Sequence, residues 1–127
     1  LPVNVLLRRS VGGESKAELL VGEWTHRAWA GEAPLIVYPP LSERPLSWPH
    51  LLGNEAIPTI TAGLLAVQPY EYLLDVWAGY GANCVVLAEE AATIVAVEED
   101  NLAGAALQAN TAGLDSVDFW AGRPGVC

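Results

Sequence analysis

The residues from Tyr72 to Glu98 constrain the fold of this chain more than any other stretch. They read YLLDVWAGYGANCVVLAEEAATIVAVE: an apolar run ending on an acid, a turn with two glycines, a helical segment and a second apolar run ending on an acid. Two short apolar runs separated by a helical segment predict parallel strands joined by a crossover helix. We therefore expect one β-α-β unit with a ligand-binding turn here.

Two glycines of the turn, Gly79 and Gly81, indicate a surface that a ligand approaches closely. Glycine has no Cβ, so the backbone can turn sharply out of a strand and lie directly against a bound molecule. The following helix, expected over residues 82–91, would offer its first backbone amides to the same place. Glu98, at the tip of the second strand, is placed to accept hydrogen bonds from a ribose diol. Both features suit an adenosine-type ligand.

Residues around the turn narrow the choice of adenosine ligand. The dinucleotide fingerprint G-x-G-x-x-G needs a third small residue for close helix-strand packing, and Cys84 occupies that position. A carboxylate at Asp75 would repel a pyrophosphate but could serve a cationic, amino-acid-bearing ligand such as S-adenosylmethionine. NAD is thus disfavoured. A buried β-α-β turn with no ligand remains the alternative explanation of a lone G-x-G.

At this point the chain resembles the class I S-adenosylmethionine-dependent methyltransferases. Their first motif is similar to hydrophobic-hydrophobic-D-x-x-x-G-x-G, and their second is an acid that ends the next strand. This resemblance implies S-adenosylmethionine as the cofactor. It also implies that the cofactor is held by Asp75, Gly79, Gly81 and Glu98.

The resemblance continues downstream of Glu98. Asp100 can cap a helix over residues 101–111, with Gly113 suited to its C-terminal stop, and residues 117–121 are expected to form a third strand. The phrase AGLDSVDFWAGR is similar to the family's N-G-L-x-N-V-x-F-x-x-G-D. Arg123 stands where the family usually has an acid that meets the adenine amino group.

The N-terminal part predicts short strands. Val3–Arg8 and Ala17–Trp24 are apolar, strand-like runs that indicate a β-hairpin with a longish turn, and Leu35–Tyr38 is expected to be a third strand stopped by two prolines. A helix is expected over residues 58–67, with Pro58 in its first turn.

The N-terminal half is most similar to the RNA uracil-5-methyltransferase family. The phrase L-R-x-S-x-G-G-E, then a linker, a helix and the L-D-x-x-x-G-x-G strand, carries this resemblance, which implies an RNA methyl acceptor. That family's D-P-P-R phrase and catalytic cysteine lie well downstream of the third strand. The chain stops at Cys127, which follows the strand too closely to be the required thiolate. We therefore expect a member truncated before its catalytic region, and no catalytic residue can be named.

The expected fold class is α/β: a partial Rossmann-like methyltransferase sheet with parallel strands ordered 3-2-1, preceded by a small β-hairpin region. Residues 1–50 are expected to be a β-rich region packed on the core. Residues 51–127 are expected to be the S-adenosylmethionine-binding Rossmann-like half domain. A chain of 127 residues has room for one core.

Composition limits the partners. Six basic against fifteen acidic residues give a formal charge of -9, which argues against a broad phosphate-binding face. The two cysteines and two histidines show no metal spacing, so no metal is expected. Because no apolar run approaches about 18 residues, a soluble, cytoplasmic protein without membrane contact is expected.

The first strand of the unit, residues 72–77, would present an open, apolar sheet edge. Either the N-terminal strands cover that edge or two chains form a homodimer through it. Two functions stay open. One is an S-adenosylmethionine-dependent methyltransferase domain that acts on RNA, and the other is a non-catalytic nucleotide-binding or scaffolding remnant that works through a partner chain.

Overall fold

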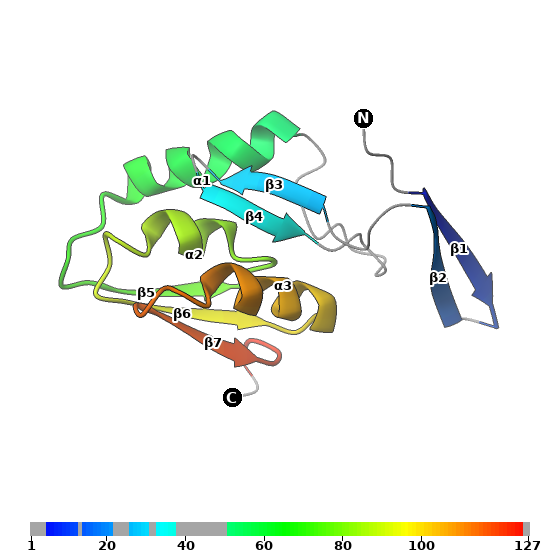
Figure 1. Cartoon of the computed structure of the whole chain (residues 1–127). Coiled ribbons are helices and arrows are strands. Elements are labelled where there is room, and N and C mark those ends of the chain that lie inside the picture. The colour runs from blue at the N-terminus through cyan, green and yellow to red at the C-terminus, as the bar shows by residue number, and fades with distance from the viewer. Residues whose placement is uncertain (1–4, 13, 22–25, 31–32, 38–50, 126–127) are drawn as a thin grey trace.

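The computed structural model describes residues 5–12, 14–21, 26–30, 33–37 and 51–125. Its centre is a parallel sheet of three strands, β5 (Tyr72–Val76), β6 (Thr93–Glu98) and β7 (Val117–Ala121), in the order β5-β6-β7 (Figure 1). The predicted α/β class, parallel pairing and 3-2-1 order are confirmed. The carboxyl ends of all three strands therefore meet at one edge of the sheet.

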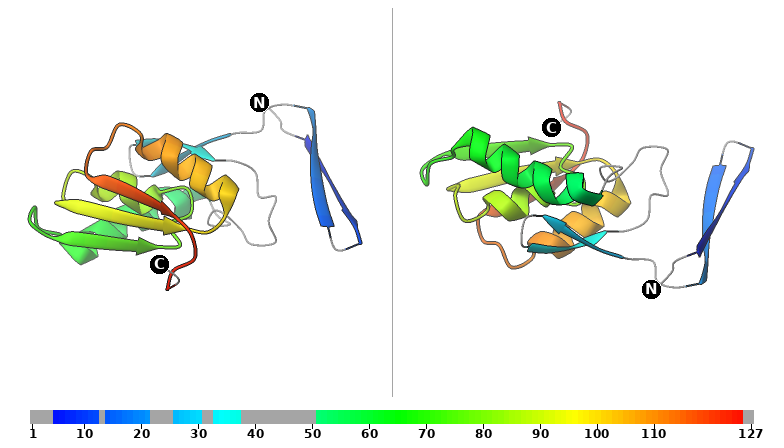
Figure 2. Two further views of the ribbon diagram at one scale, coloured as in Figure 1. Left: turned by 90° about the horizontal axis from the view of Figure 1, so that it is seen from below. Right: turned by 90° about the horizontal axis from the view of Figure 1, so that it is seen from above.

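Three helices lie on one side of this sheet: α1 (Leu51–Leu65), α2 (Ala82–Leu87) and α3 (Asn101–Thr111) (Figures 1 and 2). Strand residues that face the helices are apolar and buried, as with Ile94 and Ala96 of β6. They pack against α2 and α3 in one core cluster. The cluster consists of Ala62, Val67, Cys84, Leu87, Ala91, Ile94, Ala96 and Leu107.

The opposite face of the sheet is open to solvent. Tyr72 and Leu74 of β5 and Trp120 of β7 expose 78%, 65% and 56% of their surface. Seen from below, no described helix lies over this face (Figure 2). Because side chains alternate along a strand, the same alternation that buries Ile94 and partly buries Leu73 leaves these three outside.

The N-terminal residues form two antiparallel hairpins. β1 (Val5–Val11) pairs with β2 (Glu14–Val21), and β3 (His26–Ala30) pairs with β4 (Ala33–Val37). The first hairpin is confirmed, but its turn is short rather than longish, with Gly12 at φ 61°. The strand β3 was not predicted, since HRAWA is neither apolar nor regularly alternating.

The second hairpin packs on the helices. β3 contacts α1 and α2, and β4 contacts α3, whereas β1 and β2 lie apart from the other described elements in all views (Figures 1 and 2). Among the described strands, none of the first four pairs with β5, so the first of the two alternatives for its open edge is not seen in the described part of the chain. The proposed boundary at residue 50 falls outside the described residues and stays a prediction.

Two helix boundaries differ from the prediction. α1 begins at Leu51, which places Pro58 inside the helix rather than in its first turn. A proline there removes one backbone hydrogen bond, but its ring is fully buried in the packing of α1, which offsets part of that loss. α2 ends at Leu87, because the amides of Glu90 and Ala91 both bond to the Leu87 carbonyl and close the chain into a turn.

The predicted helix over residues 101–111 and its cap are confirmed. Asp100 Oδ1 accepts hydrogen bonds from the amides of Leu102 and Ala103, each at 2.9 Å. At the other end the C-cap is Ala112 in the right-handed region, and Gly113 follows it directly, as predicted, but without a positive φ. The described helices include none long and apolar enough to cross a membrane.

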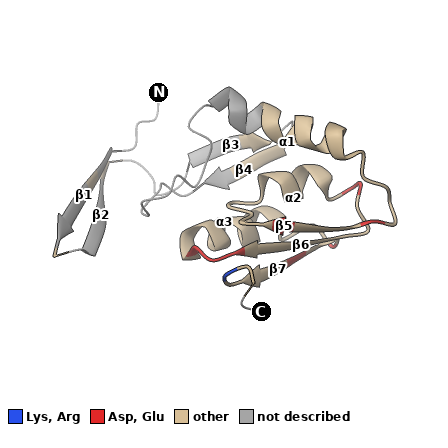
Figure 3. Ribbon diagram, turned by 180° about the vertical axis from the view of Figure 1, so that it is seen from behind, with Lys and Arg blue, Asp and Glu red and all other residues tan. Residues whose placement is uncertain are grey.

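Charge is distributed unevenly along the chain. Residues 51–127 carry ten acids and one arginine, whereas residues 1–50 carry five acids and five basic residues. The acidic positions of the described fold lie mainly at strand ends and loops, and the blue arginine near the end of the chain is Arg123 (Figure 3). The sheet and its helices therefore form the acidic part of the protein.

Replacing Asp100 with alanine tests the cap of α3. The variant loses the acceptor for two backbone amides, so we expect the free energy of unfolding in urea to fall by about 1 kcal/mol. Asp115→Ala, at an exposed position, is the control and should change it little. Equal stability of the two variants would contradict the assigned cap.

Candidate functional site

A buried carboxylate joins the ends of β5 and β6. Glu98, the last residue of β6, is 7% exposed. Its Oε2 accepts a hydrogen bond from the amide of Gly79 at 2.8 Å, and its Oε1 accepts one from the amide of Asp100 at 2.8 Å. A carboxylate offers about four acceptor positions. The two described backbone amides therefore occupy about half of these positions.

The turn after β5, residues 78–81, is called the glycine loop below. Gly79 has φ 59° and Gly81 has φ 87°, in the left-handed region that glycine adopts without a steric penalty. A Cβ on Gly81 would lie 3.2 Å from Leu107 Cγ of α3. Packing against α3 therefore explains a glycine at position 81.

Trp77, just before the glycine loop, also has a left-handed backbone, with φ 56°. This conformation costs a non-glycine residue about 1 kcal/mol, so the surrounding structure must hold it. Its side chain is 61% exposed at the carboxyl end of β5.

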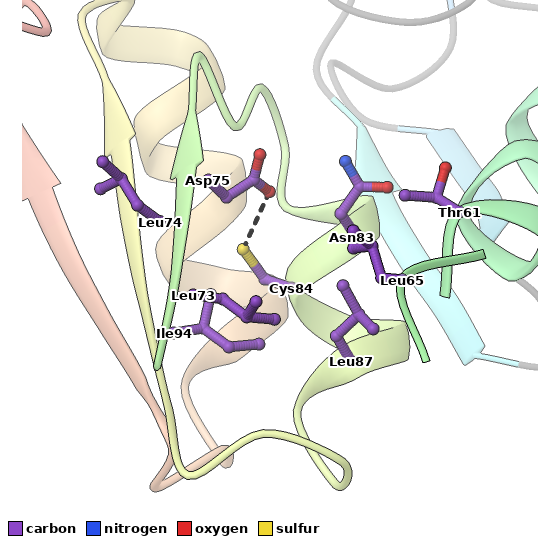
Figure 4. Close-up of a pocket in the computed structure, with 9 residues that line it drawn as sticks. All are labelled: Thr61, Leu65, Leu73, Leu74, Asp75, Asn83, Cys84, Leu87 and Ile94. Atoms are coloured by element: carbon purple, nitrogen blue, oxygen red, sulfur yellow. Dashed lines mark hydrogen bonds between the residues drawn. The ribbon is translucent and has the colours of Figure 1, made fainter. Parts of the chain in front are cut away.

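Asp75 belongs to a small polar group behind the loop (Figure 4). The thiol of Cys84 donates a hydrogen bond to Asp75 Oδ2 at 3.3 Å. Burial raises the pKa of Asp75 above its ordinary value, hydrogen bonds from Cys84 and Asn83 oppose that rise, and the nearby charge of Glu98 adds to it. Burial and the charge of Glu98 therefore favour the protonated form of Asp75.

Cys84 is a free, buried thiol on the first turns of α2. Burial, followed by the negative charge of Asp75, raises the pKa of this thiol far above its ordinary value. The thiol therefore stays protonated at neutral pH and donates its hydrogen bond to Asp75. It is a poor nucleophile, because the reactive form of cysteine is the thiolate.

A cavity of about 150 Å³ lies beside Asp75, between α1, β5 and α2. Asp75, Asn83 and Thr61 contribute polar groups to its wall, and most of its other lining residues are apolar (Figure 4). This volume is below the few hundred Å³ of typical cofactor pockets, so it accommodates a short chain rather than a whole nucleoside. The lining residues are Thr61, Leu65, Leu73, Leu74, Asp75, Asn83, Cys84, Leu87 and Ile94.

The four residues singled out in the sequence lie at the carboxyl ends of β5 and β6 and in the loop between β5 and α2. Ligands of open α/β sheets bind at this edge. Gly79 and Glu98 are in direct contact, and Asp75 and Glu98 are close enough to affect one another electrostatically. α2 has only six residues, so we assign no anion site to its first turn.

Three contributors were not predicted: Cys84 as the donor to Asp75, and Tyr80 and Asn110 at the back of the loop, where Asn110 Nδ2 donates to the Tyr80 carbonyl at 2.8 Å. No local pattern signals them, because each acts across elements.

Arg123 lies 3.6 Å from Glu99 through its Nε, and its side chain is 70% exposed. An exposed pair of this kind contributes little stability.

Comparison with known proteins identifies the fold. No protein-family model matches the chain, and no curated protein is detectably similar in sequence. Trm5b from Pyrococcus abyssi superposes with a TM-score of 0.67 at 18% identity, over 95% of this chain and 36% of that one. The chain has a methyltransferase-type fold.

Two further structures agree with this fold. TYW2 of M. jannaschii in complex with AdoMet superposes with a TM-score of 0.63 at 18% identity, over 83% of this chain and 47% of that one. The M. jannaschii tRNA m1G37 methyltransferase gives a TM-score of 0.62 at 16% identity, over 94% and 36%. The chain thus spans between a third and a half of the length of these neighbours.

Asp75→Asn tests the electrostatics of the site. The pKa of Asp75 is higher in the folded protein than in the unfolded one, so folding favours the protonated form. As pH rises from about 4 through the folded pKa, Asp75 loses its proton and the free energy of unfolding falls. We expect Asp75→Asn to stabilise the protein relative to wild type more at pH 7 than at pH 4, measured by urea unfolding. The control is Asp118→Asn on exposed β7. A difference between Asp75→Asn and wild type that does not change with pH would contradict this assignment.

Proposed function

We propose that this chain is the cofactor-binding portion of an S-adenosylmethionine-dependent methyltransferase. The observation that carries the proposal is the buried Glu98 carboxylate, which holds Gly79 of the glycine loop and keeps acceptor positions free at the carboxyl end of β6. The methyltransferase-type fold supports it and favours this function over a non-catalytic remnant.

The residues present fit the cofactor. Glu98 would accept hydrogen bonds from the ribose hydroxyls, and Gly79 and Gly81 would let the backbone lie against the ligand. Asp75 would attract the ammonium group or the sulfonium centre of the cofactor. A nearby cation lowers the raised pKa of a carboxyl group, so the bound cofactor would favour the charged form of Asp75. When bound, the cofactor supplies an electrophilic methyl group.

The methyl acceptor that we propose is RNA. Trm5b and the tRNA m1G37 methyltransferase are structural neighbours, and the N-terminal phrase resembles RNA-directed enzymes. These neighbours give no support to the uracil-5 family in particular, so we name no methylated atom. Residues 51–127 are too acidic to bind phosphates, whereas Arg8, Arg9, Lys16, Arg27 and Arg44 all belong to residues 1–50. RNA contact is therefore assigned to the N-terminal part, and cytoplasmic localisation stays a prediction.

Isothermal titration of the chain with S-adenosylmethionine and S-adenosylhomocysteine tests the cofactor site. We expect saturable binding of both, and a loss of about tenfold or more in S-adenosylmethionine affinity in Asp75→Asn, which keeps the shape of the side chain. Asp118→Asn should bind as wild type does. Glu98→Ala should abolish binding but also expose the loop amides, so its stability is measured in parallel.

The absence of heat and of a thermal shift with either ligand would overturn the proposed function. Binding without transfer of a labelled methyl group to any RNA would instead favour the non-catalytic alternative.

We also propose a homodimer through the edge of β5. Among the described strands, this edge has no partner, and Leu65 and Leu74 beside it are 53% and 65% exposed. Size-exclusion chromatography with light scattering is expected to show twice the mass of one chain, and Leu74→Lys should reduce it to one, because a charge blocks edge pairing. A wild-type monomer at all concentrations would reject the dimer.

A further inference from the structure

The residue between the two glycines of the loop is buried under the second hairpin. The Tyr80 side chain is 4% exposed and belongs to a second core cluster with Ala30 of β3, Leu35 of β4 and Ala106 of α3. Ala30 and Leu35 are each 1% exposed. A segment near the N-terminus therefore covers the middle of the loop that follows β5.

The glycine loop is also held from two other directions. Asn110 of α3 donates a hydrogen bond from Nδ2 to the Tyr80 carbonyl at 2.8 Å, and Leu107 fills the space beside Gly81. On the sheet side, Glu98 accepts the amide of Gly79. The contacts from β6 and α3 come from the sheet unit itself. Among the described residues, β3 and β4 reach the loop through the cluster that contains Tyr80.

We propose that the hairpin of β3 and β4, acting through the Tyr80 ring, holds the glycine loop in the conformation that binds the cofactor. Tyr80 is then a positioning residue, and cofactor affinity depends on a hairpin that does not itself form the binding surface. This inference rests on the proposed function for the identity of the ligand, although the coupling of hairpin and loop is measurable without it.

The physical reason is the freedom of the two glycines. Gly79 and Gly81 both have a positive φ, and glycine adopts many other backbone conformations at similar free energy. Burial of the aromatic ring between them limits the loop to one conformation. If the ring or its apolar cover is removed, the binding-competent fraction falls, and the apparent affinity falls by the same factor.

The coupling acts in both directions. Because linkage is reciprocal, a cofactor that favours the ordered loop also stabilises the packing of β3 and β4 on it. A macromolecule that binds the hairpin and moves Leu35 would release the cofactor. One that holds Leu35 against Tyr80 would retain it.

Four variants of the full chain separate this role from general destabilisation. Tyr80→Ala removes the ring, Tyr80→Phe keeps it, and Leu35→Ala removes the cover from the hairpin side. Val67→Ala is the control, because Val67 is 9% exposed in the first core cluster, which does not contain Tyr80.

Two measurements are made on each variant. The first is hydrogen exchange of the Gly79 and Gly81 amides without ligand, compared with the β6 amides, which report global unfolding. These loop amides donate to Glu98 and to the Ala78 carbonyl, at 2.8 Å and 3.0 Å. The second is titration with S-adenosylhomocysteine.

In Leu35→Ala and Tyr80→Ala we expect loop protection to fall about tenfold more than that of β6, and affinity to fall about tenfold with it. Tyr80→Phe, which keeps the ring, should lose less loop protection and affinity than Tyr80→Ala, and Val67→Ala should keep both at the level of wild type. Unchanged loop protection in both Leu35→Ala and Tyr80→Ala would overturn the inference. If wild type binds no S-adenosylhomocysteine, the proposed function fails, while the exchange measurement still decides whether the hairpin holds the loop.

Discussion

The hydrogen bond between the Glu98 carboxylate and the Gly79 amide is the contact on which the site depends. It joins the end of β6 to the loop that follows β5, and the same carboxylate receives the Asp100 amide, where α3 begins. A carboxylate that is 7% exposed is stable only when its oxygens have donors. One buried side chain therefore fixes the glycine loop and the entry to α3 together.

This arrangement gives Glu98 two roles that use the same two oxygens. Two backbone amides satisfy it in the free protein, and the remaining acceptor positions would receive the ribose hydroxyls. Asp75 behaves differently, because burial and the charge of Glu98 raise its pKa. Glu98 is hydrogen-bonded by backbone amides, whereas the pKa of Asp75 is raised. A site with these two carboxylates suits a ligand with hydroxyl donors at one end and a positive charge at the other.

The sequence predicts the β-α-β unit well, because its signals are local: apolar runs for β5 and β6, glycines for the turn, and Asp100 for the start of α3. It fails where tertiary contacts decide. Pro58 indicated a helix start, but α1 begins at Leu51, and burial of the Pro58 ring offsets part of the cost of a proline inside the helix. β3 has no strand pattern of its own and forms because it pairs with β4 and packs on α1 and α2. Of the site, Asp75 and Glu98 could be named from spacing, whereas the buried cluster that contains Tyr80 and Leu35 joins segments that no spacing relates.

A crystal structure of the chain with S-adenosylhomocysteine tests the central claim most directly. The account predicts that both ribose hydroxyls lie within hydrogen-bond distance of the Glu98 carboxylate while the Gly79 amide stays bonded to Oε2. It also predicts that the ligand's amino group lies on the Asp75 side of the loop. A ligand bound elsewhere, or a Glu98 carboxylate that contacts only backbone amides in the complex, would contradict it.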